Sequence, residues 1–572
     1  MLDELRCAAA RCGAKPEPEE RWIVRHARLA ALFIRAGELA QGLADAAFGR
    51  DGIDRLTPQN LHADEALRRS ATLLLHSWDS AQPASGAELA ALVDLLSRAA
   101  EETPDAPIIT KEGEGYAFYA LYPEAYGIAA RVLAGCGPTV IGLRSIGLGL
   151  GAIVAARTAA TLSLSLRPVG HPFARELALA DTLRSALAER RHQPFAIVDE
   201  GPGLSGSSFT AAAEALERLG VAAERIHFFP SHRHLPGGAG APHVRARWQA
   251  TPRHVATFDD MVLHAHTQCH RLETWVEDLT GRALAPLEEV GGGAWRDLKP
   301  YIPRPPASAR TERRKFLLRS ADGTFLLRFA GLGRHGDACL RRATALADAG
   351  FAPPVLGLRH GFLVERWLED AMPLDPRAGR SGFVARLAAY LAFRAKHLAV
   401  ESGGADATEL LCMARRNIGL VLGEEPESKK VTALTPFDPG ALNGRICRFA
   451  TDNRMHAWEW LRLPEGRIVK ADAYDHCAGH DLIGCQDIAW DAVGARFEFS
   501  LDDSEFGELI DRLGTFGVRL DTQVMAFYAP CYLAFQLGMF QLDAAVAPTH
   551  RDAQSLQRCA SFYRDALGRL RF

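Results

Sequence analysis

The sequence has almost no excess of either charge. Its 572 residues include 66 Lys and Arg against 69 Asp and Glu, which leaves a formal net charge of -3. Affinity for a nucleic-acid backbone comes mainly from clustered lysine and arginine, so a nucleic-acid-binding protein usually has more basic than acidic residues. Nucleic acid is therefore disfavoured as the main partner, although a local basic patch stays compatible with the composition.

Long apolar runs are also lacking. Arg or Gly interrupts each apolar stretch before it reaches the roughly 18 residues that a membrane-spanning helix needs. Residues Met1–Arg6 include acidic side chains and are not followed by the apolar segment of a signal peptide. The 11 cysteines stand singly, without a CxxC pair, as in a reducing cytosol. These absences predict a cytoplasmic protein with no membrane segment.

The sequence has the length and composition of several globular domains. It is 48% hydrophobic and 24% charged, and 572 residues exceed what one hydrophobic core usually organises. Residues 1–100 are rich in Ala, Leu and Arg at helical spacing, whereas short apolar strands alternate with helices in 101–285. We expect a multidomain α/β and α+β protein: a helical region at 1–100, a parallel-sheet domain at 101–285, a linker at 286–312 and a further domain at 313–572.

Four strands are predicted in the sheet domain, at Thr139–Leu143, Thr161–Leu166, Phe195–Val198 and Ile226–Phe229. Helices are expected at about Gly149–Thr158, Arg175–Arg190 and Ser207–Leu219. Pro236–Pro242 is a predicted surface loop. The aromatic segment Tyr116–Tyr126 favours packing in a core, with a base-stacking platform as the alternative.

Residues 195–209, FAIVDEGPGLSGSSF, carry the strongest chemical signal. An apolar strand ends in Asp199 and Glu200, and a loop rich in glycine and serine then enters a helix. Ligands of open parallel sheets bind at the carboxyl ends of strands. Backbone amides, hydroxyls and the helix N-terminus together suit a phosphate. A serine-rich helix cap after a solvated acidic strand end is the structural alternative.

This segment resembles the phosphoribosyl-diphosphate (PRPP) motif of type I phosphoribosyltransferases, although Ser205–Ser208 departs from Thr-Gly-Gly-Thr. The resemblance implies that Asp199 and Glu200 hold the ribose hydroxyls. It also implies that a 5-phosphoryl group is held by Gly203, Leu204, Ser205, Gly206, Ser207 and Ser208. The resemblance further implies that Mg²⁺, held through Asp199 and Glu200, bridges the diphosphate during transfer of the phosphoribosyl group to or from a small acceptor.

Two further segments extend this resemblance. Arg144 and Ser145, after the first strand, match the first diphosphate-binding loop, although an ordinary strand–helix turn has a similar sequence. Arg167, His171 and Arg175 occupy the place of a mobile loop that closes over the diphosphate. A proline-kinked connector with solvated bases is the alternative there.

The C-terminal half resembles the aminoglycoside-phosphotransferase and protein-kinase-like fold. The matching segments are a hairpin at Lys315–Phe329 turning at Asp322-Gly323, a helix at about Asp337–Asp348, a strand at Gly361–Arg366 and a strand pair at Ala457–Arg462 and Arg467–Lys470. The resemblance makes Asp472 a Mg²⁺ ligand and gives Asp487, which opens an Asp-x-Ala helix start, the role of bracing the catalytic loop.

This half departs from the kinase pattern in several places. Arg328 stands at the nucleotide-binding lysine position, the following helix has no clear Glu, and the catalytic loop lacks the usual His-Gly-Asp. Asp452, His456 and Glu459 are the nearby groups that could replace the missing base and metal ligand. Phosphoryl transfer depends on positioning and charge stabilisation, so these changes favour a binding or structural module over an active kinase.

The sequence therefore predicts a phosphoribosyltransferase-like enzyme that uses PRPP and Mg²⁺ and acts on a phosphosugar or nucleotide. Two rivals stay open: a sensor that binds PRPP or a nucleotide without catalysis, and a small-molecule kinase that uses ATP in the C-terminal domain. Oligomeric state is left open, with a homo-oligomer possible. The cluster His264, His266, Cys269 and His270 does not have the spacing of a structural zinc site, and we interpret it as polar side chains of a helix.

Overall fold

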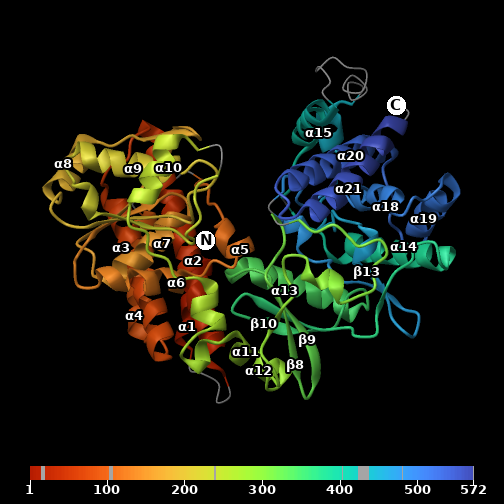
Figure 1. Cartoon of the computed structure of the whole chain (residues 1–572), viewed down its shortest axis with the longest axis horizontal. Helices are drawn as coiled ribbons and strands as arrows, with labels where there is room; N and C mark the ends of the chain where they lie inside the picture. The colour runs from red at the N-terminus through yellow and green to blue at the C-terminus, as the bar shows by residue number, and fades with distance from the viewer. Residues whose placement is uncertain are drawn as a thin grey trace. The chain divides into compact units, whose positions relative to one another are not determined.

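The computed structural model describes residues 1–14, 20–101, 107–237, 240–308, 310–401, 403–422, 437–479 and 481–570 (Figure 1). The chain divides into two compact units. The first comprises Met1–Asp278 with the short segments Ala330–Asp337 and Leu358–Phe362, and the second comprises the remainder. Among the described residues no helix is long and apolar enough to cross a membrane.

The N-terminal region of the first unit is helical, as predicted. It contains α1, α2, α3 and α4, at Leu2–Gly13, Trp22–Asp51, Pro58–Ser80 and Gly86–Glu101. Thr57 caps α3 by accepting a hydrogen bond from the Asn60 amide, and Pro58 occupies the first turn, where its missing N–H costs nothing. The short helices α5 (Glu114–Phe118) and α6 (Pro123–Ala129) divide the predicted aromatic segment, in which Tyr116, Tyr122 and Tyr126 are buried.

A parallel four-stranded sheet forms the centre of the first unit. Its order is β2-β1-β5-β6, with the strands at Leu162–Leu166, Thr139–Leu143, Phe195–Val198 and Ile226–Phe229. Every residue of β1 and β5 is buried, as expected where helices cover both faces of a sheet. Helices α7, α8, α9 and α10 connect or follow these strands, at Ile146–Thr158, Asp181–Glu189, Ser207–Arg218 and Pro242–Ala250.

The order of the strands creates a switch point between β1 and β5. The chain leaves β1 for β2 on one side of the sheet, and it leaves β5 for β6 on the other side. The crevice at such a point, beyond the carboxyl ends of the strands, is the usual ligand site of an open α/β sheet. Arg144-Ser145 and Asp199-Glu200 directly follow these two strands.

Gly142 in β1 is required by the close approach of the next turn. A Cβ atom at this position would lie 2.2 Å from the Gly147 carbonyl oxygen and 2.8 Å from Leu148 Cα. We therefore expect Gly142→Ala to lower the free energy of unfolding by about 1–3 kcal/mol, because backbone must move. Thermal unfolding measures the change. Gly49→Ala in α2, where a Cβ meets no atom within 4 Å, is the control and should raise stability by about 0.5–1 kcal/mol. Equal effects of the two substitutions would contradict the packing argument.

The segment between β2 and α8 differs from its prediction. Strands β3 (Pro168–His171) and β4 (Ala174–Leu177) form an antiparallel hairpin where a connector and a helix from Arg175 were expected. The predicted helix at His264–His270 is also wrong, because irregular backbone precedes a single turn of 3-10 helix at Gln268–His270. The predicted loop at Pro236–Pro242 includes residues 238–239, which lie outside the described residues. The short helices α11 (Leu272–Trp275) and α12 (Glu277–Thr280) follow.

The second unit contains most of a five-stranded sheet of order β10-β11-β9-β8-β7, in which β7 pairs with β8 and β8 with β9 in antiparallel fashion. The predicted hairpin is present as β8 (Lys315–Ser320) and β9 (Gly323–Phe329), and α13 (Gly333–Asp348) follows it. The remaining strands of the sheet are β7, β10 and β11, at Glu288–Glu289, Val355–Arg359 and Phe362–Arg366. A smaller sheet joins β12, β13 and β14, at Met372–Pro373, Trp460–Arg462 and Ile468–Lys470, which confirms the second predicted strand pair.

Helices form the rest of the second unit. They are α14, α15, α17, α18, α19, α20 and α21, at Arg380–His397, Ala407–Leu422, Pro439–Asn443, Ala489–Glu498, Asp503–Thr515, Thr522–Ala545 and His550–Arg569. Trp490, Tyr528 and Tyr532 are fully buried in the core that α15, α18, α20 and α21 share. Asp502 and Glu505 form a reciprocal capping box at the start of α19, so the sequence specifies where that helix begins.

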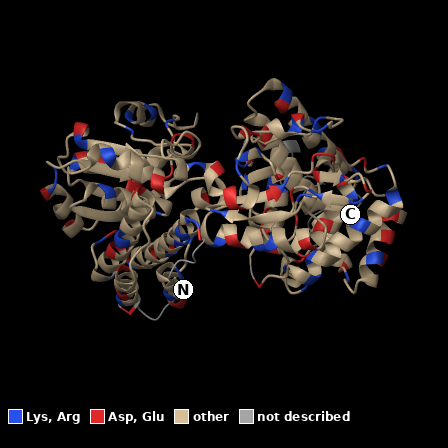
Figure 2. Ribbon diagram, turned by 90° about the horizontal axis from the view of Figure 1, so that it is seen from below, with Lys and Arg blue, Asp and Glu red and all other residues tan. Residues whose placement is uncertain are grey.

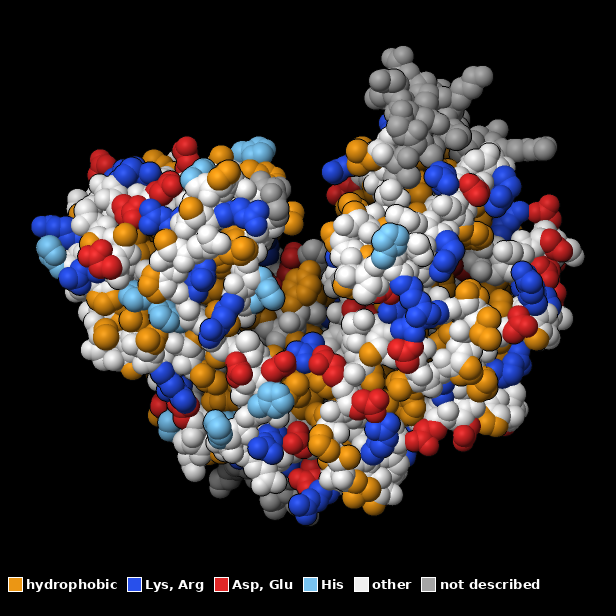
Figure 3. Space-filling model, viewed as in Figure 1, with side chains coloured by type: hydrophobic (Ala, Val, Ile, Leu, Met, Phe, Trp, Pro, Cys, Tyr) orange, Lys and Arg blue, Asp and Glu red, His pale blue; other side chains and the backbone are white. Residues whose placement is uncertain are grey.

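Basic and acidic residues are intermixed along the ribbon (Figure 2). On the face drawn in Figure 3, Lys and Arg side chains likewise alternate with Asp and Glu. This distribution agrees with the low net charge and gives no support on that face for a polyanion-binding surface.

Candidate functional sites

Asp199 and Glu200 lie half-buried at the end of β5. The Glu200 amide donates a hydrogen bond to Asp199 Oδ1 at 2.8 Å, and the Tyr126 hydroxyl donates to the Asp199 carbonyl at 2.9 Å. Burial raises the pKa of Asp199 to about 7, and burial followed by the charge of Asp199 raises the pKa of Glu200 to about 8. A carboxylate pair that exchanges protons near neutral pH is typical of a functional site.

This pair predicts a distinctive pH dependence of stability. Because both pKa values in the folded protein lie above the roughly 4 of an exposed carboxylate, folding favours the protonated forms, and stability falls as pH rises through the window from about 4 to 8. The variant Asp199→Asn/Glu200→Gln cannot titrate there. Its melting temperature relative to the natural sequence should therefore rise steadily from pH 5 to pH 8.

Glu176→Gln/Glu189→Gln is the control for this experiment, since it removes two exposed carboxylates of the same unit. Its melting temperature relative to the natural sequence should change little over the same range. A difference for the Asp199/Glu200 variant that stays constant with pH would show that the two carboxyl groups are not held protonated.

The loop Gly203–Ser208 forms hydrogen bonds with the β3–β4 hairpin, which the sequence did not predict. Ser205 and Ser207 each donate a hydrogen bond to the Pro172 carbonyl at 2.7 Å, and their hydroxyl oxygens lie 2.9 Å apart. Gly206 has a φ of +70°, a conformation that glycine adopts without strain, and α9 begins after it. A phosphoryl group bound to these hydroxyls would have to replace the Pro172 carbonyl. Phosphate binding by the segment Gly203–Ser208 therefore stays a prediction.

The predicted diphosphate residues are not all directed to one site. Arg144 is buried and forms an ion pair with Asp54, and its guanidinium lies near Asp45 as well. Arg167 binds Asp45 through its side chain and Asp54 through its backbone amide. The two arginines are thus already paired with carboxylates, and their binding of a diphosphate stays a prediction. Ser145 precedes α7, whereas His171 and Arg175 lie on the β3–β4 hairpin, where Arg175 donates to the Gly170 carbonyl.

A second group of charged side chains lies in the second unit, around Asp452. This carboxylate is fully buried, with Lys470 Nζ at 3.0 Å and His476 Nδ1 at 3.1 Å from Oδ1, while Oδ2 accepts a hydrogen bond from Tyr390. Burial alone would raise the pKa of Asp452, but Lys470, His476 and Arg394 together hold it well below its usual range. Asp452 is therefore ionised at neutral pH.

Backbone contacts fix the loop that carries Asp452. The buried carboxylate of Asp491, in α18, accepts hydrogen bonds from the amides of Asp452 at 2.7 Å and Asn453 at 2.8 Å. The sequence assigned this bracing role to Asp487. Asp487 instead accepts from the amides of Ala489 and Cys447, at 2.9 and 3.0 Å, and so caps the start of α18. The brace is therefore Asp491, one helical turn later.

Asp472 and Arg328 meet beside the Asp452 loop. Arg328 Nη1 donates to Asp472 Oδ1 at 2.5 Å, and its guanidinium lies over the Tyr474 ring at 4.1 Å from the centroid. Burial would raise the pKa of Asp472, but Arg328 and then His476 hold it well below its usual range. Arg328 Nη2 has no hydrogen-bond partner among the described residues. This donor is available to an anion.

His476 connects the two carboxylates, because its Nε2 lies 3.6 Å from Asp472 Oδ1 and its Nδ1 contacts Asp452. Glu459 joins the same group through Lys470, at 2.5 Å. The predicted residues Arg328, Asp452, Glu459 and Asp472 are thus brought together, and Asp487 is not. The same group includes residues that the sequence did not indicate, namely Tyr390, Arg394, Lys470, His476 and Asp491.

The donors of this group suit Mg²⁺. Two sets of potential ligands are close enough to share one ion: Asp472, Asp475 and His476, and Asp452, Glu459 and His476. Mg²⁺ prefers carboxylate oxygens, and Asp472 has 26% of its side chain exposed, so it is the most accessible carboxylate. Asp472 with Asp475 would therefore hold the ion and leave room for waters and phosphate oxygens.

We compared the chain with protein-family models, curated proteins and solved structures. No family model matches the sequence, and no curated protein matches it. Among solved structures, the chain is similar to choline kinase LicA from Streptococcus pneumoniae, with 12% identity, a TM-score of 0.34, and coverage of 51% of this chain and 96% of that one. The chain is also similar to spectinomycin phosphotransferase in complex with ADP and spectinomycin, with 10% identity, a TM-score of 0.35, and coverage of 53% of this chain and 95% of that one. For macrolide 2'-phosphotransferase type I the identity is 13%, the TM-score is 0.33, and the coverage is 50% of this chain and 94% of that one. The resemblance of the first unit to phosphoribosyltransferases stays a prediction.

Proposed function

We propose that the chain is a magnesium-dependent phosphotransferase that moves the γ-phosphoryl group of ATP to a hydroxyl-bearing small molecule in the second unit. The observation that carries the proposal is that His476 lies between Asp452 and Asp472, and that Arg328 pairs with Asp472. Phosphoryl transfer needs a carboxylate for the acceptor proton, a carboxylate for Mg²⁺ and a cation for the phosphates, and this group supplies all three.

Each charged residue has a defined role in the proposed step. Asp452 accepts the proton of the acceptor hydroxyl, whose oxygen then forms the bond to the γ-phosphorus while the bond to the bridging oxygen of ADP breaks. Asp472, with Asp475, would hold Mg²⁺, which supplies charge stabilisation to the phosphates when bound. Arg328 would bind phosphate oxygens through Nη2, its donor without a partner.

The step requires an exchange of ion-pair partners, because Asp452 and Asp472 are already paired with cations. Lys470 contacts Asp452, Glu459 and the Asp472 carbonyl, so a small movement transfers it from Asp452 to a phosphoryl oxygen while Glu459 keeps it in place. Arg328 would move from Asp472 to the phosphates in the same way. Both exchanges keep every charge neutralised, which limits their cost in a buried site.

Binding of ATP with Mg²⁺ followed by thermal shift, and transfer from γ-labelled ATP to candidate acceptors, test this proposal. Asp472→Asn should abolish the Mg²⁺-dependent part of the shift and the transfer. The control, Asp503→Asn, removes an exposed carboxylate paired with Arg496 and should change neither. An unaltered shift and transfer in Asp472→Asn would refute the assignment. Binding of ATP without transfer to any acceptor would favour the nucleotide sensor.

The strand order of the first unit favours a second candidate function there, binding of a phosphorylated sugar such as PRPP. Asp199 and Glu200 lie at the switch point beside the β1–α7 turn, where such a ligand is expected. Thermal shift with PRPP and Mg²⁺ is the test. Asp199→Asn/Glu200→Gln should abolish the shift, whereas Glu176→Gln/Glu189→Gln should retain it. No shift with the natural sequence would exclude this candidate, and diphosphate release with an acceptor would make it a transferase.

A further inference from the structure

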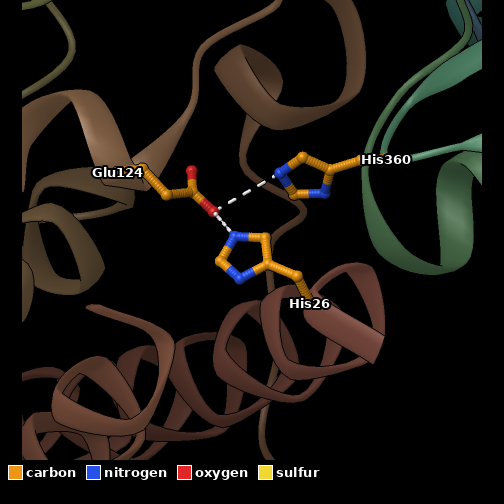
Figure 4. Close-up of side chains that lie close together, drawn as sticks. All are labelled: His26, Glu124 and His360. Carbon is orange, nitrogen blue, oxygen red and sulfur yellow. Dashed lines mark hydrogen bonds and ion pairs between the residues drawn. The ribbon is translucent and has the colours of Figure 1, made fainter. Parts of the chain in front are cut away.

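Two histidines and a glutamate converge in the first unit. His26 comes from α2, Glu124 from α6, and His360 from the tight turn between β10 and β11, a segment that belongs to the same unit. The close-up in Figure 4 shows the imidazole rings of His26 and His360 directed at one oxygen of Glu124. All three side chains are fully buried.

The spacing of the three side chains suits a shared metal ion. His26 Nε2 lies 2.8 Å from Glu124 Oε1, His360 Nε2 lies 3.4 Å from the same oxygen, and the candidate ligand atoms all fall within 4.8 Å of one another. Ligands bound tetrahedrally to zinc at about 2.0–2.1 Å are separated from each other by about 3.3 Å. Small side-chain movements therefore place the three donors around one zinc ion.

Hydrogen bonding leaves part of this group unsatisfied. Glu124 Oε2 and both ring nitrogens of His360 have no hydrogen-bond partner among the described residues, although all are buried. A buried carboxylate oxygen and an imidazole without partners cost free energy, which a bound cation would recover. The Nδ1 atom of His26 lies 3.0 Å from the Ser77 hydroxyl, an outer contact of the kind that orients a metal-bound imidazole.

The backbone and the surroundings agree with a dedicated site. His360 has a φ of +41°, which is uncommon outside glycine, and this conformation directs its ring at Glu124. Aromatic rings of Trp78, Trp275 and Tyr122 pack against the two histidines in tilted or edge-on arrangements. Burial lowers the pKa of His26 to about 4, so its imidazole is neutral, as a metal ligand must be. Glu124 is ionised, because the hydrogen bond from His26 and its contacts with His360 hold its pKa well below the usual range despite burial.

We propose that His26, Glu124 and His360 form a structural zinc site that joins α2, α6 and the β10–β11 turn. A set of two imidazoles and one carboxylate selects zinc over Mg²⁺ or Ca²⁺, because those two ions prefer oxygen ligands alone. The second oxygen of Glu124 is available as the fourth ligand. Because the aromatic rings exclude solvent, the role is structural and independent of the proposed phosphotransferase chemistry.

Metal analysis of the full chain tests the site. The protein is stripped with a chelator, shown to remain folded by circular dichroism, and titrated with Zn²⁺ against a chromophoric competitor. We expect about one zinc ion per chain and a higher melting temperature with zinc. His360→Gln should weaken zinc binding by more than about 100-fold. The control is His270→Gln, which alters a neighbouring histidine that stacks on Trp78 and lies outside the set.

The outcomes separate zinc binding from a metal-free hydrogen-bonded group. His270→Gln should bind zinc as the natural sequence does, and Glu124→Gln provides a second ligand variant if His360→Gln does not fold. Failure of the folded natural sequence to take up zinc would overturn the proposal. Equal zinc affinity in folded His360→Gln or Glu124→Gln would overturn it as well. Cobalt substitution adds an independent readout, since a tetrahedral site gives intense visible absorption that the ligand variants should lose.

Discussion

Asp452→Asn is expected to lower the rate of phosphoryl transfer by about 10²–10⁴-fold while the second unit stays folded. A positioned proton acceptor contributes about this factor to catalysis, and an amide of the same size cannot accept the acceptor proton. The fold should survive because the cations around Asp452 have other partners. Lys470 keeps Glu459 and the Asp472 carbonyl, and Arg394 keeps the carbonyls of Ala450 and Ala473.

The measurement is the rate of transfer from ATP at saturating Mg²⁺, with circular dichroism and thermal unfolding on the same samples. Glu465→Gln, an exposed carboxylate in the turn between β13 and β14, is the matched control and should leave the rate unchanged. A rate for folded Asp452→Asn within a factor of three of the natural sequence would remove Asp452 from the chemistry. Transfer would then have to depend on another group, such as Glu459, a carboxylate of the same cluster.

Local patterns in the sequence predicted the main strands and the acidic residues that follow them, whereas the chemistry of those residues stays a prediction. Apolar runs that end in acidic residues indicated β5, which Asp199 follows, and β14, which Asp472 follows. Such a signal can be found in the sequence because the apolar strand and its polar end are encoded by neighbouring residues. The hairpin at Asp322-Gly323 was predictable for the same reason, since a two-residue turn is encoded where it occurs. The hairpin of β3 and β4 was not, because it is half-exposed and lacks a clear alternation of apolar residues.

Contacts between distant segments could not be predicted. Arg144 and Arg167 have the charge that a diphosphate requires, but Asp45 and Asp54 neutralise them from a helical region far upstream. Nothing near Arg144 in the sequence indicates these partners. Lys470 and His476 were missed around Asp452 for a similar reason: each lies close to Asp472 in sequence, but only the folding of the chain brings them to Asp452.

The choice between Asp487 and Asp491 shows the limit of a motif. Both acids lie at the start of one helix, four residues apart, and the resemblance selected the first of them. A helix start exposes several backbone amides that need an acceptor, and Asp487 satisfies one of them, that of Ala489, together with the amide of Cys447 from a distant segment. Asp491, inside the helix and fully buried, is the one that faces the Asp452 loop.

This geometry predicts that Asp491→Asn destabilises the second unit by about 2–3 kcal/mol, the cost of leaving a buried polar group unsatisfied. Both oxygens of Asp491 accept a backbone hydrogen bond, so an amide NH₂ in place of one oxygen would set two donors against each other in a buried site. Chemical denaturation measures the loss, and any remaining phosphoryl transfer should fall as well, because the Asp452 loop loses its support.

Asp487→Asn is the matched control, since it makes the same substitution in a carboxylate that also accepts two backbone amides. Its cost should be about 1 kcal/mol, typical of a helix cap, because Asp487 is half-buried and water can replace a lost bond. If Asp487→Asn proves as destabilising as Asp491→Asn, the loop is not braced from within the helix. The larger of the two effects therefore identifies the acid that holds Asp452 in place: the fully buried Asp491 or the half-buried Asp487.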